Sequence, residues 1–291
     1  MPQLPVVAAL AIQLALAALA NLLVARWRLP GIVALAASML APWAIPAEDM
    51  GGRAVATLFE AVWALKVIDQ ARAPRALGEA MLHLVAIVDL RRARPVPPAV
   101  WFRGIAWAAA ATAVATVAYL VASSGSALAP QLLAAVVFAY AVADVVDRTV
   151  RSIFRLAGFE VEAVQRDPVL SRTVTEFWGR RWNGLVHRWL DATFFRPLAR
   201  RGFPHAGLVA AFVASAALHA YIAIVPLGLR GAAWMGGFFL VQGAIVFAER
   251  QLGVAAKPWA RAWTVTVLLA SSPLFTWPLL AVLGLRPLPG D

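Results

Sequence analysis

The chain has 291 residues, of which 62% are hydrophobic and 14% are charged, and its formal net charge is +11. Soluble proteins carry roughly 25% charged residues, and a water-soluble protein of this size could not bury so large an apolar share. The composition therefore excludes a soluble enzyme, a disordered chain and, because cysteine is absent, a disulfide scaffold. It predicts an all-α polytopic integral membrane protein with a single membrane domain over residues 1–291.

A membrane-spanning helix needs about 20 predominantly apolar residues. Eight segments meet or approach this length, and the third is the weakest because it contains Glu60 and Lys66. In chain order they are Leu4–Ala25, Leu29–Pro46, Ala54–Ile68, Val100–Ala122, Pro130–Val146, Ala206–Pro226, Ala232–Ala248 and Ala262–Gly284. A further apolar stretch, Leu77–Leu90, is too short to span, and we expect it to lie in the interface or to re-enter the membrane.

The basic residues gather in alternate loops, and 23 of the 26 fall on one side. The exceptions are Arg53, Arg230 and Arg286. Because cytoplasmic loops carry an excess of lysine and arginine, this bias predicts eight spans with both termini outside the cytoplasm. The first span lacks a basic leading segment and is expected to be retained. The arginine-rich composition suggests a bacterial inner membrane.

The chain is organised around a long cytoplasmic segment, 147–205, which lies between N-terminal spans over 4–146 and C-terminal spans over 206–284. Its central part is rich in aromatic and basic residues. On a helix, Trp178, Trp182, Leu185 and Trp189 would share one face. This pattern predicts a helix that lies in the headgroup layer.

Two further features of this segment have a chemical meaning. Thr173 or Thr175 could cap the start of the helix, and Glu176 follows Thr173 at the spacing of a capping box. Asn183 and His187 form a second stripe beside the aromatic one. The alternative interpretation is that the whole segment is only an interfacial anchor.

His219 lies in an apolar segment, about 20 Å along the helix from its expected start near Ala206. An ionisable group at that depth indicates a functional site. Apolar surroundings favour the uncharged imidazole, which is the form that a general base needs. The alternative is a hydrogen bond between helices. The remaining histidines, His83 and His205, have no partner at metal-ligand spacing, so no metal site is predicted.

These residues resemble a known family. The stretch Glu176-Phe-Trp-Gly-Arg-Arg-Trp-Asn183, followed by the intramembrane His219, is similar to the wax synthases of the membrane-bound O-acyltransferase (MBOAT) superfamily. Phe195–Arg200 and Phe238–Glu249 also resemble this family, and the similarity covers Asp167–Trp277. Ala220 stands where the family often has an acidic residue, and the first half of the chain has no matching motif.

The resemblance implies an MBOAT-like helical bundle that transfers a fatty acyl group from acyl-CoA to a lipid hydroxyl, with a long-chain alcohol as the leading acceptor. It implies that His219 is the general base and that Asn183 orients it or donates to the developing oxyanion. Binding of acyl-CoA or its acyl chain is expected at Trp178, Arg180, Arg181, Trp182, His187, Ser215 and Gln242.

Several alternatives remain open. The acceptor could be a sterol, a diacylglycerol or a bacterial glycolipid or secondary metabolite, and the arginines could bind only lipid headgroups. A non-enzymatic lipid-binding or transport protein is the competing class. No cofactor beyond acyl-CoA as substrate and no nucleic acid is expected, and a homo-oligomer is possible.

Overall fold

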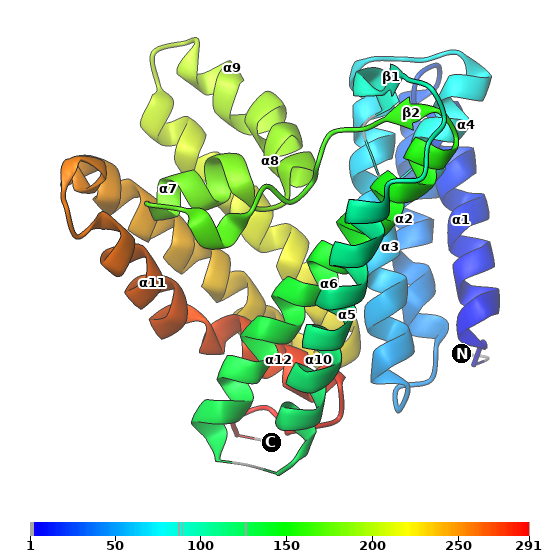
Figure 1. Ribbon diagram of the computed structural model, residues 1–291. Coiled ribbons are helices and arrows are strands. Elements are labelled where there is room, and N and C mark those ends of the chain that lie inside the picture. The colour runs from blue at the N-terminus through cyan, green and yellow to red at the C-terminus, as the bar shows by residue number, and fades with distance from the viewer. Residues whose placement is uncertain (1–2, 87, 89, 126, 291) are drawn as a thin grey trace. The chain divides into compact units, whose positions relative to one another are not determined.

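A computed structural model describes residues 3–86, 88, 90–125 and 127–290 of the chain. The described residues are mostly helical (Figure 1). The chain divides into two compact units, one comprising Met1–Ile87 with Leu218–Ala233 and the other comprising Val88–Ala217 with Trp234–Asp291. The long helix α10 (Pro204–Gln251) contributes to both units.

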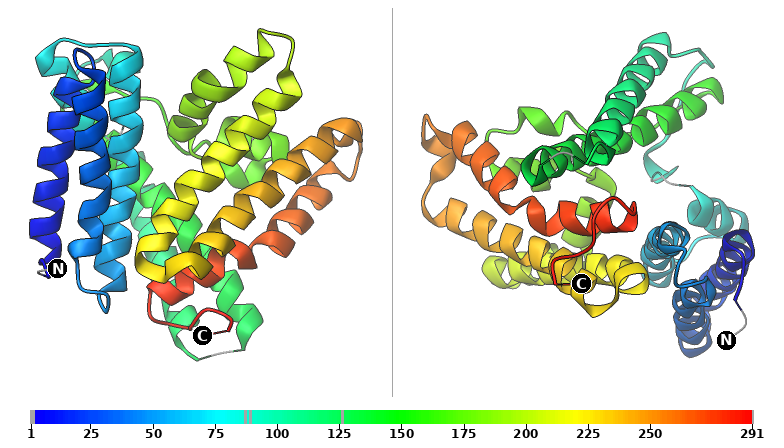
Figure 2. Two further views of the ribbon diagram at one scale, coloured as in Figure 1. Left: turned by 180° about the vertical axis from the view of Figure 1, so that it is seen from behind. Right: turned by 90° about the horizontal axis from the view of Figure 1, so that it is seen from below.

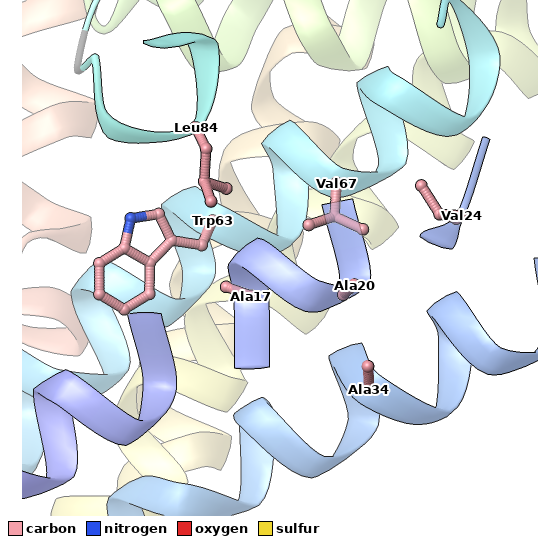
Figure 3. Packing of buried hydrophobic residues seen from close by; sticks show 7 residues of the cluster. All are labelled: Ala17, Ala20, Val24, Ala34, Trp63, Val67 and Leu84. Atoms are coloured by element: carbon pink, nitrogen blue, oxygen red, sulfur yellow. The ribbon is translucent and has the colours of Figure 1, made fainter. Parts of the chain in front are cut away.

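The first unit is built around three helices that pack through small side chains. Ala17 and Ala20 of α1, Ala34 of α2 and Val67 of α3 are buried in one cluster with Trp63 and Leu84 (Figure 3). Alanine at these contacts lets helix backbones approach closely, as is usual in membrane bundles. The helices are α1 (Val6–Leu23), α2 (Arg28–Leu40) with the 3-10 turn η1 (Ala41–Ala44), α3 (Met50–Arg72) and α4 (Leu77–Val85).

The third helix carries a carboxyl group inside this bundle. Glu60 is fully buried, and it accepts hydrogen bonds from Ser38 Oγ at 2.6 Å and from Gln13 Nε2 at 3.3 Å. A buried polar group is costly unless it is hydrogen-bonded. The partners on α1 and α2 therefore explain how the weak third segment, Ala54–Ile68, becomes part of a helix that packs in the bundle.

The second unit contains the α5–α6 hairpin, a short antiparallel ladder, the motif segment and the C-terminal helices. In the register of this ladder, Arg94 of β1 lies opposite Glu160 of β2. The elements are η2 (Leu90–Arg92), β1 (Arg94–Pro95), α5 (Phe102–Ser123), α6 (Leu128–Leu156), β2 (Phe159–Glu160), η3 (Pro168–Leu170), α7 (Val174–Glu176), the π-helix η4 (Phe177–Arg181), α8 (Gly184–Leu190), the π-helix η5 (Asp191–Phe195), α9 (Arg196–Ala199), η6 (Val254–Ala256), α11 (Ala260–Ser271) and α12 (Pro273–Val282).

Helix α10 is broken rather than continuous. Gly228 has φ 66° and ψ −166°, which divides the 48 residues of α10 into two arms of roughly equal length. In the second unit the arms lie side by side (Figure 2), and a Cβ on Gly243 would come within 2.8 Å of Phe212 Cβ. The two arms correspond to the predicted segments Ala206–Pro226 and Ala232–Ala248.

The helices agree with a polytopic membrane protein. Four of them are long and apolar enough to cross a membrane within the described part of the chain, namely α1, α5, α6 and α10, and the bent pair α11 and α12 would make a fifth. The predicted last span, Ala262–Gly284, is therefore two helices that meet at 43°. The number of eight spans stays a prediction.

Helix α6 runs well beyond the expected end of its span at Val146, because it continues to Leu156. The segment predicted to be cytoplasmic from Asp147 therefore begins as a continuation of this helix, and its location stays a prediction. Arg148 pairs with Asp144 at 2.7 Å, an (i, i+4) ion pair that supports a helix. Asp147 Oδ1 also accepts a hydrogen bond from Val164 N at 2.7 Å, which holds the returning chain against the helix.

Candidate active site

The motif segment begins with a capped turn. Thr173 Oγ1 accepts a hydrogen bond from Glu176 N at 2.9 Å, which confirms Thr173 as the helix cap. The carboxylate of Glu176 reaches back to Arg172 N at 2.8 Å, one residue before the position that a standard capping box uses. The chain therefore begins its helical turn at the residue that the local sequence predicts.

The expected continuous helix is broken at Trp182 and Asn183. Trp182 has extended ψ, and Asn183 has φ 43° and ψ 61°, in the left-handed region that asparagine tolerates better than most residues. The prediction of a single helix with Trp178, Trp182 and Trp189 on one face was therefore wrong. The indole of Trp182 instead stacks on Phe177, with ring centroids 5.5 Å apart and planes 12° apart.

Asn183 is held at this break by hydrogen bonds on both sides. Its side-chain Oδ1 accepts from Val186 N at 3.3 Å and caps α8, and its backbone N–H donates to Gln165 Oε1 at 3.2 Å. Within the described ranges, no group accepts a hydrogen bond from Asn183 Nδ2. The cap therefore orients the amide and leaves its two hydrogens available to an acceptor.

Trp178 and Gln242 belong to one chain of hydrogen bonds. Trp178 Nε1 donates to Gln242 Oε1 at 3.0 Å, and Gln242 Nε2 donates to Ser271 Oγ at 2.7 Å. Gln242 is fully buried, and the Trp178 ring packs against the Phe239 ring with centroids 5.4 Å apart. The structure thus brings Trp178 and Gln242 together, and their contacts fix the π-helix η4 to the second arm of α10.

Glu249 makes the second attachment of the motif segment, and the sequence offers little sign of its partners. It is buried near the end of α10, where Oε1 accepts from Val174 N at 2.9 Å and Oε2 accepts from Thr175 N at 2.7 Å and Thr175 Oγ1 at 2.6 Å. A carboxylate that accepts the free N–H groups at a helix start stabilises that start. In the sequence, the one sign that Glu249 has a structural role is its position as an acidic residue at the end of an apolar segment.

The two neighbouring arginines of the motif have different surroundings. Arg181 Nε donates to Glu176 Oε1 at 2.6 Å, and its Nη1 donates to the carbonyl of Arg166 at 3.1 Å. The hydrogen bond from Arg172 N, together with the Arg181 guanidinium, lowers the pKa of Glu176 below its usual value. Arg180 is exposed, and among the described residues it has no hydrogen bond or ion pair.

The remaining polar residues of α8 are partly buried. Arg188 Nη1 lies 3.2 Å from Glu162 Oε2, so this arginine is paired with a carboxylate. Burial lowers the pKa of His187 below its ordinary value of 6.5, which keeps the imidazole uncharged near pH 7. No group of three or more histidine, aspartate or glutamate side chains could hold a metal ion within the ranges that the structure describes.

His219 lies in the first unit, and Asn183 lies in the second. His219 is half-buried on the first arm of α10, and Ser215, one turn earlier, is buried in the second unit. Close to His219 in sequence, Tyr221 Oη donates to the Met39 carbonyl at 2.9 Å. The pairing of His219 with Asn183 stays a prediction.

The region that contains these residues matches a known family. Residues 161–241 match the sequence model of the membrane bound O-acyl transferase family, and this range includes both the motif and His219. The resemblance to the membrane-bound O-acyltransferases is confirmed.

Individual relatives agree with that match. The chain is 31% identical over 102 residues to the probable long-chain-alcohol O-fatty-acyltransferase 2 of Arabidopsis thaliana, which covers 32% of this chain and 30% of the relative. It is 28% identical over 152 residues to the probable long-chain-alcohol O-fatty-acyltransferase 3 of the same plant, covering 44% and 42%. It is 36% identical over 77 residues to diacylglycerol O-acyltransferase 1 of Bos taurus, covering 26% and 16%. The matches thus span less than half the length of each of these relatives.

Proposed function

We propose that this protein is a membrane-bound O-acyltransferase that moves a fatty acyl group from acyl-CoA to the hydroxyl of a long-chain alcohol. The observation that carries the proposal is the joint presence of Asn183 and His219 in the matched range 161–241. The orientation of the Asn183 amide by its cap also supports it. The plant relatives, which are named as probable long-chain-alcohol O-fatty-acyltransferases, favour a long-chain alcohol as acceptor.

The proposed reaction needs a base, because an alcohol hydroxyl has a pKa far above neutral. The His219 imidazole removes the hydroxyl proton as the oxygen attacks the thioester carbonyl carbon. The new C–O bond forms, the carbonyl oxygen gains negative charge, and the C–S bond then breaks. The thiolate of CoA leaves and takes the proton from the imidazolium, so the products are an ester and CoA.

Asn183 has a different role in this scheme. Its Nδ2 donates a hydrogen bond to the carbonyl oxygen as negative charge develops there, which is worth about 3–4 kcal/mol for one well-placed donor. The exposed Arg180 is the candidate contact for the phosphates of CoA, because a guanidinium forms charge-assisted hydrogen bonds with phosphate. His187, Trp182 and Ser215 remain proposed contacts of the acyl donor.

Diacylglycerol is the second candidate acceptor, because diacylglycerol O-acyltransferase 1 of Bos taurus is among the relatives. We also propose that the protein resides in a bacterial inner membrane. Membrane fractionation of the source cells would test that location.

The function is tested with the purified full chain in lipid nanodiscs. Radiolabelled oleoyl-CoA is supplied with hexadecanol, dioleoylglycerol or a sterol, and both the labelled ester and the released CoA thiol are measured. We expect ester formation that is fastest with hexadecanol. His219→Ala should abolish it while expression and thermal unfolding in detergent stay close to wild type. Absence of ester with every acceptor, or activity of His219→Ala within a few-fold of wild type, would contradict the proposal.

A further inference from the structure

The first arm of α10 carries two backbone irregularities shortly after His219. In an α-helix each carbonyl accepts a hydrogen bond from the N–H four residues later. Pro226 has no N–H, so the carbonyl of Ile222 loses its partner within the helix. Gly228, with φ 66°, turns the chain away and removes the N–H that would have reached the Val225 carbonyl.

Helix α3 supplies donors to both of these carbonyls. Thr57 Oγ1 lies 3.2 Å from the Ile222 carbonyl oxygen, and Arg53 Nη1 donates to the Val225 carbonyl oxygen at 3.2 Å. The two donors are one helical turn apart on α3, and their acceptors are about one turn apart on α10. An unpaired backbone carbonyl is costly in an apolar environment. The two hydrogen bonds therefore fix one particular packing of α10 against α3.

Both donors are themselves anchored. Thr57 is fully buried, and its single hydroxyl hydrogen is shared with the carbonyls of Arg53 and Ala54 at 2.8 and 3.0 Å. The Arg53 guanidinium also donates to the Ile45 carbonyl through Nε at 3.0 Å and Nη2 at 2.8 Å. Arg53 thus joins the loop after η1 to α10 inside the first unit.

A third contact lies nearer to the histidine. Tyr221 Oη donates to the Met39 carbonyl at 2.9 Å, and its ring packs against Trp43 with centroids 6.2 Å apart. All three contacts lie within two turns after His219 on the same helical arm. Together they restrict rotation and sliding of this arm relative to the helices of the first unit.

We propose that Thr57 and Arg53 are positioning residues for His219, because they fix the part of α10 that carries it by satisfying the carbonyls that Pro226 and Gly228 release. This inference rests on the proposed acyltransferase function. The two α3 side chains act through the backbone of α10 and do not touch substrate. A small displacement of a catalytic group has a large effect on rate, so their loss should reduce kcat more than it raises KM.

A double-mutant cycle tests this role directly. Thr57→Val keeps the shape of the side chain but removes the donor to Ile222, and Thr57→Ser keeps the donor. Pro226→Ala adds a backbone N–H that can donate to the same carbonyl. We expect Thr57→Val to lower kcat by roughly tenfold with little change in KM for acyl-CoA, and Thr57→Ser to stay close to wild type. In the Pro226→Ala background, Thr57→Val should cost less than about threefold.

Thr116→Val is the matched control. Among the described residues, Thr116 Oγ1 donates only to the Thr112 carbonyl of its own helix, at 2.9 Å, and the side chain is exposed. The kcat of Thr116→Val should therefore equal that of wild type. Amide hydrogen exchange over residues 219–225, measured on each full-length variant in nanodiscs, should accelerate in Thr57→Val and return toward wild type when Pro226→Ala is added.

The outcomes separate the two levels of inference. A wild-type kcat for Thr57→Val, or an equal loss in both backgrounds, overturns the positioning role while the acyltransferase proposal stands. If the wild-type protein releases CoA without an acceptor and forms no ester, the proposed function is overturned. The positioning role of Thr57 and Arg53 in catalysis is then overturned as well. Faster exchange and a lower kcat that are both rescued by Pro226→Ala support the inference.

Discussion

Glu249 and Thr175 are joined by two hydrogen bonds although 74 residues separate them in the chain. Glu249 Oε2 accepts from Thr175 N at 2.7 Å and from Thr175 Oγ1 at 2.6 Å. The carboxylate thereby fixes the start of the motif segment to the second arm of α10, and Trp178 repeats the attachment two turns earlier on that arm through Gln242. The position of Asn183 depends on these attachments, since it follows them closely in the chain.

Replacing Glu249 should therefore loosen the motif segment. Glu249→Gln removes the charge and leaves an NH2 group facing backbone N–H donors, so we expect a loss of about 1–3 kcal/mol in unfolding free energy and a lower kcat. Thermal unfolding in detergent and the ester assay measure the two effects. Glu79→Gln changes an exposed carboxylate and is the control. Unchanged unfolding in Glu249→Gln would show that these hydrogen bonds contribute little.

Variants of Asn183 can separate its structural role from its proposed chemical role. Asn183→Asp keeps an oxygen that can cap α8 and a residue that tolerates positive φ, but it removes the Nδ2 donor. We expect kcat to fall by about a hundredfold or more while thermal unfolding stays near wild type. Asn183→Ala should lower both. If Asn183→Asp retained wild-type kcat, the amide would have no part in the chemistry.

Arg180 and Arg181 should differ although they are adjacent. Arg181 holds Glu176 at 2.6 Å, whereas Arg180 is exposed. Arg180→Gln should raise KM for acyl-CoA several-fold, and the difference from wild type should shrink at high salt because exposed charges are screened. Arg181→Gln should instead lower the thermal stability of the protein. Steady-state kinetics at several salt concentrations and thermal unfolding distinguish the two, and equal salt-dependent KM effects would contradict the assignment.

The lowered pKa of His187 predicts a pH effect on α8. Burial lowers its pKa in the folded chain below the ordinary value of 6.5, so the unfolded segment binds more protons than the folded one as pH falls. The stability of α8 should be full above pH 6.5 and decrease below it. Hydrogen exchange over residues 184–190, corrected for the intrinsic pH dependence, should show this loss in wild type and a smaller one in His187→Gln. His205→Gln, at an exposed histidine, should behave like wild type.

Local features of the chain were predicted well from the sequence. The apolar lengths indicated a polytopic membrane protein, and the helical segments lie close to where they were expected. Thr173 was one of two predicted caps, and it performs that role. The motif Glu176–Asn183 identified the family resemblance. Each of these features depends on side chains that are neighbours along the chain.

The sequence by itself thus determined the membrane class and the residues on which the proposed chemistry depends. Tertiary structure decided how the backbone is bent at Asn183, that Glu249 binds the motif segment, and that Thr57 and Arg53 reach α10 across 165 and 172 residues. The physical reason is that apolar length and helix capping are local properties. The partner of a carbonyl freed by proline, or of a buried carboxylate, is chosen by packing between distant helices, and no pattern within one helix encodes it.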